Sequence, residues 1–187
     1  MKSLIRASSQ TSWLILLGIL LIGFNILLAQ YMPSEHALDL QFAYSPAQAY
    51  DSLSFLDAAE RSQYRWAMTV FDMPYLVVYT LFFSGLLYRL RGKKEAWIFP
   101  ALAAIFDLLE NLSTLYLLKV FPEKSDWVAL IASFSSTSKW IFVYPSSSGC
   151  NQELYKKEHS CGKSHKSQNL ILLASSFLLI SFLYPNF

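Results

Sequence analysis

The stretch "AAIFDLLENLSTLYLLKV" (103–120) is apolar enough to lie in a lipid bilayer, yet it carries two acids and an amide in its middle. Asp107, Glu110, Asn111 and Thr114 follow the spacing i, i+3, i+4 and i+7, which places them on one stripe of a helix. Leucine is the commonest residue at the other positions. Polar side chains in membrane helices bond across helix contacts. The pattern therefore predicts a spanning helix whose polar stripe faces other helices.

Around this stretch, the apolar residues of the 187-residue chain come in long blocks. Hydrophobic residues make up 54% of the chain and charged residues 15%, whereas a soluble domain carries about a quarter charged residues. A spanning helix needs roughly 20 mostly apolar residues. We expect an all-α, polytopic transmembrane bundle of four or five spans that forms a single domain, 1–187. The expected spans are about 12–31, 67–88, 96–119 and 127–144, with a possible fifth at 170–185.

The first apolar block also has the basic flank of a signal peptide, since Lys2 and Arg6 precede it. Its apolar core is too long for a signal peptide, and no small-x-small cleavage site follows. The pattern favours an uncleaved membrane anchor.

The basic residues are distributed unevenly between the expected loops. Segments 1–10, 89–95 and 145–169 hold ten Lys and Arg residues, whereas 33–66 and 119–126 hold four. Positive residues favour the cytoplasmic side. We therefore expect a multi-pass protein of the inner (plasma) membrane with a cytoplasmic N-terminus. The net charge of +2 is explained by this asymmetry, so membrane lipids are the expected partners and nucleic acid is not.

Between the first two spans, the sequence contains a clear helix start. Ser45 is suited to the N-cap, Pro46 to the first helical position and Gln48 to the reciprocal position of a capping box. Apolar residues recur at helical spacing through 45–66, which predicts an amphipathic extracytoplasmic helix. Either it caps the bundle by packing, which we favour, or it acts as a lid over a ligand.

The second span contains three polar or aromatic residues near its outer end. Asp72, Tyr75 and Tyr79 lie at i, i+3 and i+7, so we expect them on one face, lining an outer approach to the core. Pro74 cannot donate to the carbonyl of Val70, so the helix should kink or loosen there.

The fourth span brings a lysine to the depth of the polar stripe. At 1.5 Å per residue, Lys139, Glu110 and Asp107 all lie roughly 15–19 Å from the outer face. We expect a buried polar site of Asp107, Glu110, Asn111 and Lys139, with an ion pair between the lysine and one carboxylate. The other carboxyl group must then be protonated, be hydrated or hold a cation.

This excess carboxyl group predicts binding of a proton, an ion or a small amphiphile. Two alternatives stay open: a membrane enzyme using carboxylate acid–base chemistry on a lipid-soluble substrate, and a structural subunit of an oligomer or membrane complex whose polar groups only specify packing. The spans contain no histidine and no metal-ligand pair, so neither a metal site nor a cofactor is expected, and binding is favoured over catalysis.

The chain changes character after residue 144. Residues 145–169 are rich in Ser and Lys and read as a polar cytoplasmic loop. Cys150 and Cys161, with the nearby histidines, match no standard zinc spacing. The segment 145–187 is either a native tail or a frame-altered continuation of a longer fourth helix.

Residues 44–140 resemble a group of uncharacterised bacterial four-helix integral membrane proteins. The resemblance rests on Asp72, the D-x-x-E-N pattern of 107–111 and Lys139. It implies a four-span bundle and no particular chemistry, and the tail from Pro145 departs from it. Acids inside a small bundle are also similar to those of membrane sterol isomerases. The histidine expected in such a site is missing from these spans, so that likeness bears only on the catalytic alternative.

Overall fold

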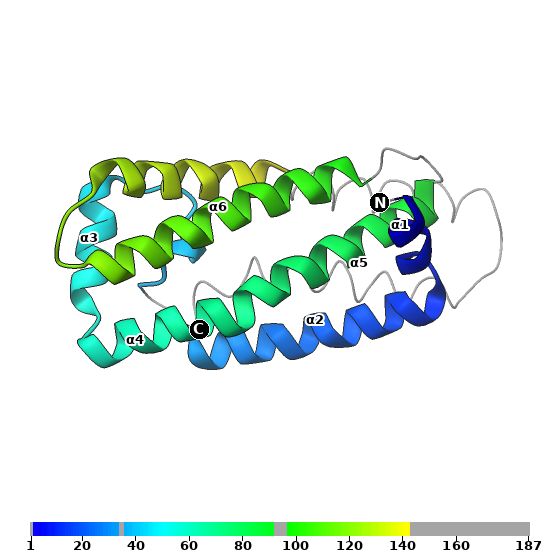
Figure 1. The fold of residues 1–187 in the computed structure, drawn as a ribbon, viewed down its shortest axis with the longest axis horizontal. Coiled ribbons are helices and arrows are strands. Elements are labelled where there is room, and N and C mark those ends of the chain that lie inside the picture. Colours follow the sequence, from blue (N-terminus) through cyan, green and yellow to red (C-terminus); the bar gives the residue numbers. More distant parts are fainter. Residues whose placement is uncertain (1, 34–35, 92–96, 143–187) are drawn as a thin grey trace.

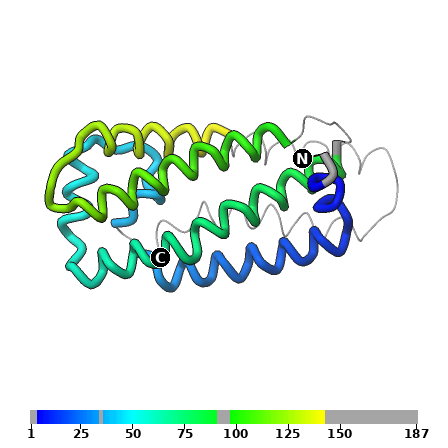
Figure 2. Tube along the Cα trace, viewed as in Figure 1, coloured from blue at the N-terminus to red at the C-terminus, as the bar shows by residue number. Residues whose placement is uncertain are grey.

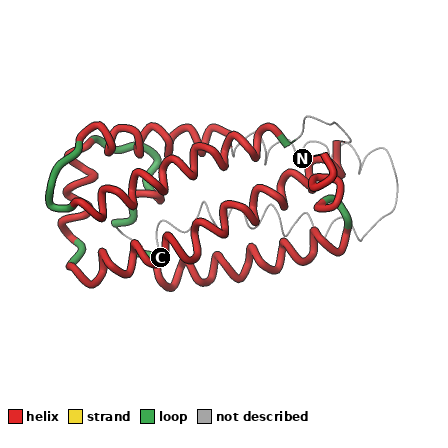
Figure 3. The backbone as a smooth tube through the Cα atoms, in the orientation of Figure 1, coloured by secondary structure: helices red, strands yellow, loops and turns green. Residues whose placement is uncertain are grey.

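The computed structural model describes residues 2–33, 36–91 and 97–142, and every regular element in these ranges is helical (Figure 3). The predicted loop 145–169 and the possible span 170–185 lie outside the described residues. The elements are α1 (Lys2–Ser8), α2 (Thr11–Tyr31), η1 (Leu38–Leu40), α3 (Pro46–Phe55), α4 (Ala58–Ala67), the π turn η2 (Met68–Asp72), α5 (Met73–Arg91), α6 (Ile98–Val120) and a helix described over 126–142.

Three of the described helices are long and apolar enough to cross a membrane. They are Thr11–Tyr31, the continuous helix Ala58–Leu90 and Ile98–Val120. The outward face of α2 exposes large apolar side chains such as Ile19 and Ile26, each 61% exposed, which suits contact with lipid. The all-helical class and three of the expected spans are therefore confirmed at the level of length and composition.

The long helices lie side by side along one axis (Figure 1). Helix α5 packs between α2 and α6, and α1 lies at the end of the bundle opposite to α3 (Figure 2). Gly85 permits the close packing of α1 on α5, because a Cβ atom there would lie 2.6 Å from the carbonyl oxygen of Ser8.

The helix predicted between the first two spans begins where the sequence indicates. Ser45 and Gln48 form the capping box of α3. The predicted single helix is nevertheless divided in two, because Asp57 forms a second capping box with Glu60 and starts α4. Two such caps satisfy the amide groups that each helix start leaves without partners.

The inward face of α3 joins a hydrophobic core at that end of the bundle. Tyr50 and Leu53 of α3 pack in the same cluster as Leu117 of α6 and Ala129 of the 126–142 helix. The Tyr50 hydroxyl also accepts a hydrogen bond from the Ser125 amide in the turn between those two helices. These contacts favour the packing interpretation of α3 over the lid interpretation.

The loosening expected near Pro74 takes the form of a π turn. Since Pro74 has no N–H, it cannot bond the carbonyl of Val70. The backbone instead closes a wider turn, in which the Met73 N–H donates to the Met68 carbonyl. Such turns inside helices often occur at functional positions. This one ends at Asp72, which is buried.

Candidate functional site

The polar stripe of α6 faces the interior of the protein, as predicted. Glu110, Asn111 and Thr114 have no exposed surface, and Asp107 is 6% exposed. On the opposite face, Leu112 is 52% exposed. Two hydrophobic cores flank the stripe along α6. One includes Ala104, and the other includes Leu117 and Leu118.

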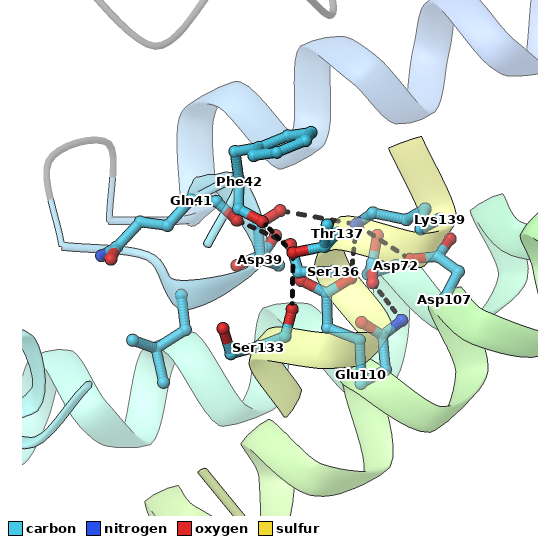
Figure 4. Close-up of polar contacts among 12 residues, drawn as sticks. Asp39, Gln41, Phe42, Asp72, Asp107, Glu110, Ser133, Ser136, Thr137 and Lys139 are labelled. Carbon is cyan, nitrogen blue, oxygen red and sulfur yellow. Dashed lines mark hydrogen bonds and ion pairs between the residues drawn. The ribbon is translucent and has the colours of Figure 1, made fainter. Parts of the chain in front are cut away.

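Lys139 of the 126–142 helix meets this stripe and pairs with two carboxyl groups. Its Nζ atom lies 2.7 Å from Glu110 Oε2 and 3.1 Å from Asp107 Oδ1 (Figure 4). It also donates to the backbone carbonyl of Asp39 at 3.4 Å. Lys139 therefore meets the stripe as the sequence predicts, but it has two carboxyl partners where one is predicted.

Two residues expected at an outer approach belong to the cluster itself. The Tyr79 hydroxyl donates to Asp107 Oδ2 at 2.9 Å, and Asn111 Nδ2 donates to Asp72 Oδ2. Asp72 was placed too far out, because the sequence shows its height along the helix but not that it faces Asn111 directly. Tyr75 stacks edge-on against Tyr79, and its hydroxyl accepts a hydrogen bond from Asn25 of α2 at 3.2 Å.

A fourth carboxyl group, which the sequence reasoning missed, comes from η1. Asp39 is 9% exposed, and its Oδ1 accepts a hydrogen bond from the Tyr64 hydroxyl at 2.5 Å. The same hydroxyl accepts from the Leu38 amide at 2.9 Å. Burial raises the pKa of Asp39, while the charge of Lys139 and the bond from Tyr64 act against that rise. An acid between two leucines, in "ALDLQF", was the available signal.

The backbone around Asp39 is held by hydroxyl groups of the 126–142 helix. Ser136 Oγ donates to the Gln41 carbonyl at 2.6 Å, and Thr137 Oγ1 donates to the Phe42 carbonyl at 2.8 Å (Figure 4). The Tyr44 amide donates to Ser133 Oγ at 3.0 Å. These bonds position the 37–44 segment against the carboxyl cluster.

Four buried oxygens of the site have neither a hydrogen bond nor an ion pair among the described residues, whereas Glu110 Oε2 faces the Lys139 ammonium: they are Tyr44 Oη, Glu110 Oε1, Asn111 Oδ1 and Thr114 Oγ1. Three of these belong to adjacent turns of α6. Burial raises the pKa of the Tyr44 hydroxyl well above its ordinary range, and the charge of Glu110 raises it further. Tyr44 is therefore a neutral hydroxyl group placed close to the Glu110 carboxyl group.

The cluster contains more acids than bases. Its four carboxyl groups are Asp39, Asp72, Asp107 and Glu110, and within the described ranges only the last two form ion pairs, both with Lys139. A buried unpaired charge is costly, so buried acids are either neutralised or paired. The described part of the chain shows no group of three or more His, Cys, Asp or Glu residues arranged to hold a metal ion.

Comparisons of the chain with protein-family models, with curated proteins and with solved structures found no match. The interpretation of the site therefore rests on its own geometry.

Proposed function

We propose that the chain is an integral membrane protein with a cytoplasmic N-terminus, located in a bacterial inner membrane. Three helices of spanning length and composition support the first part. The excess of Lys and Arg in 1–10, 89–95 and 145–169 supports the orientation.

Single cysteines test this orientation. In a background where Cys150 and Cys161 are Ser, the exposed residues Gln10 and Ser54 are each replaced by Cys. We expect a membrane-impermeant maleimide to label Ser54→Cys in spheroplasts and to label Gln10→Cys only after lysis. The reverse pattern would contradict the proposed orientation.

We further propose that the protein binds and releases a proton at Glu110. The observation that carries this proposal is the unequal environment of the two Glu110 oxygens. Oε2 lies 2.7 Å from the Lys139 ammonium, whereas Oε1 is buried with no hydrogen-bond partner in the described structure. Asp107 has the ammonium on one oxygen and the Tyr79 hydroxyl on the other.

The different surroundings of these two acids support Glu110, rather than Asp107, as the proton-binding group. The charge of Asp107 is stabilised at both oxygens, so Asp107 retains the lysine when only one acid can be ionised. Glu110 is then the acid that takes the proton, and Asn111 Oδ1 and Thr114 Oγ1 are nearby acceptors without donors. The ionisable side chains of the cluster around Glu110 are Lys139, three further acids and three tyrosines: Asp39, Asp72, Asp107, Tyr44, Tyr64 and Tyr79. This arrangement supports a proton-linked role, because buried acids in membrane proteins commonly serve as proton relays.

Infrared difference spectra of the purified protein test the proposal. We expect a carboxylic-acid C=O band that shifts in D₂O, diminishes as the pH rises and is absent in Glu110→Gln. The matched control is Glu123→Gln, since Glu123 is exposed and this variant should keep the band. Asp39 and Asp72 are also buried acids without an ion pair among the described residues, so acid bands of their own can persist in this variant; identical titrating bands in the wild type and in Glu110→Gln would contradict the proposal.

A further inference from the structure

The two ends of the bundle differ in polarity, and the carboxyl cluster lies between them. Towards α1, the cluster is followed by a hydrophobic core that includes Leu17 of α2 with Phe82 and Leu86 of α5. Within the described ranges, the buried polar side chains on that side are Ser8 and Ser84, which are neutral hydroxyl groups. Charge is costly in apolar surroundings, so a proton that left the cluster towards α1 would meet no buried ionisable group of the described residues.

Towards α3, the cluster is covered by a connection and not by a helix of spanning length. Asp72, Asp107 and Glu110 belong to the helices Ala58–Leu90 and Ile98–Val120, whereas Asp39 lies in the connection between α2 and α3. This connection reaches the protein surface beside Asp39, since Phe42 is 59% exposed. Asp39 is therefore the acid of the cluster that is best placed to exchange protons with water.

Lys139 joins Asp39 to the proton-binding acid. Its Nζ atom lies 2.7 Å from Glu110 Oε2 and donates to the Asp39 carbonyl at 3.4 Å (Figure 4). The Tyr64 hydroxyl donates to the Asp39 carboxyl group at 2.5 Å. The other ionisable neighbours of Asp39 are Tyr44, Asp72 and Asp107. Asp39 and Glu110 thus belong to one polar group, which extends from α6 to the connection.

We infer that the Glu110 proton enters and leaves the protein at the α3 end of the bundle, and that Asp39 passes it between the cluster and water. This inference rests on the proposed proton site, and it adds the side from which that site is reached. As the proton leaves, the O–H bond of Glu110 breaks and one forms on Asp39. The Asp39 proton then goes to bulk water, so the protein loses one proton overall. In the orientation proposed above, the α3 end is extracytoplasmic.

Vesicles of phosphatidylethanolamine and phosphatidylglycerol with a strongly buffered interior test the side of access. The protein carries Ser54→Cys as its single cysteine, in a background where Cys150 and Cys161 are Ser. A membrane-impermeant maleimide gives the fraction of molecules whose α3 end faces the bath, and preparations that differ in this fraction are compared. The Glu110 acid band is measured as the infrared difference between this protein and the same protein with Glu110→Gln.

Raising the pH of the bath alone should remove the Glu110 band of the labelled molecules, and a proton ionophore should then remove the rest. The lost fraction of the band should therefore rise in proportion to the labelled fraction. A lost fraction that falls as labelling rises would place the access at the α1 end and overturn the inference. So would loss of the whole band in every preparation, or loss only after the ionophore is added. In these cases the band titrates and proton binding stands, whereas a protein without a Glu110 band would contradict proton binding itself, and the inference with it.

Asp39→Asn tests the residue that passes the proton. Asn has the size of Asp, and its Oδ1 can still accept from the Tyr64 hydroxyl, but its side chain cannot carry the proton. After a pH jump in detergent, the Glu110 band of this variant should decay about a hundredfold more slowly than that of the wild type, the lower end of the usual contribution of a positioned acid or base. A merely structural role of Asp39 would change the position of the band and leave its rate of decay unchanged.

The matched control is Asp51→Asn, since Asp51 is exposed on α3, and its rate should equal that of the wild type. Asp39→Glu retains a carboxyl group and should recover most of the rate. Equal rates in Asp39→Asn and Asp51→Asn would overturn the role of Asp39. The vesicle measurement leaves Asp39 unchanged, so it tests the side of access even where Asp39→Asn does not fold.

Discussion

Replacing Lys139 by Met should abolish stable folding of the protein or lower its stability by about 3–5 kcal/mol, the usual cost of removing one partner from a buried ion pair. Met is of similar length and fills much of the same space. Asp107 and Glu110, which both contact Nζ, are left facing one another without a cation. Since domains are stable by only about 5–15 kcal/mol, the loss is a large fraction of the total.

Neutralising Glu110 and Asp107 should restore the stability that the protein loses in Lys139→Met. Thermal unfolding in detergent is compared for Lys139→Met, for the double variant with Glu110→Gln and for the triple variant with Asp107→Asn added. We expect stepwise recovery, because replacing a whole buried charge group by neutral residues is often close to neutral. Lys119→Met, at an exposed position of α6, is the control and should resemble the wild type. A triple variant no more stable than Lys139→Met would show that packing, and not charge, makes Lys139 necessary.

The sequence predicted the part of the site that lies on regular helices. Helical periodicity groups Asp107, Glu110 and Asn111 on one stripe, and the rise per residue places Lys139 at the same depth. Both predictions need only the periodicity and the rise per residue of single helices. In the structure Lys139 contacts Asp107 and Glu110, whereas the Asn111 side chain donates to Asp72.

The rest of the site depends on the path of the segment that connects α2 to α3. Asp39 and Tyr44 follow α2 in a connection whose path no periodicity predicts. Their places are set by bonds such as those from Ser136 and Thr137, which join residues about 95 positions apart in sequence. Asp72 was misplaced because its height along its own helix does not show that it faces Asn111 of α6 directly.

Tyr64→Phe is the second substitution with a large expected effect, because the Tyr64 hydroxyl bonds the connection that carries Asp39. The Tyr64 hydroxyl links α4 to η1 by two hydrogen bonds, as a donor to Asp39 Oδ1 and as an acceptor from the Leu38 amide. Phe keeps the ring and its packing, so no cavity is made. Two buried polar groups lose their partner, at about 1–3 kcal/mol each, so the total loss should be roughly 2–6 kcal/mol.

The effect should also be local, and hydrogen exchange measured by mass spectrometry can detect it. In Tyr64→Phe, amides of the 37–44 segment should exchange faster, because the Leu38 amide is no longer bonded, whereas peptides from the centre of α6 should change less. Tyr116→Phe is the control, since Tyr116 is 48% exposed. Unchanged exchange in 37–44 would mean that the bonds from Ser133, Ser136 and Thr137 alone position this segment.

If the segment is released, Lys139 also loses its contact with the Asp39 carbonyl. The infrared band of Glu110 should then shift in this variant, because the lysine that faces its Oε2 is held by fewer bonds.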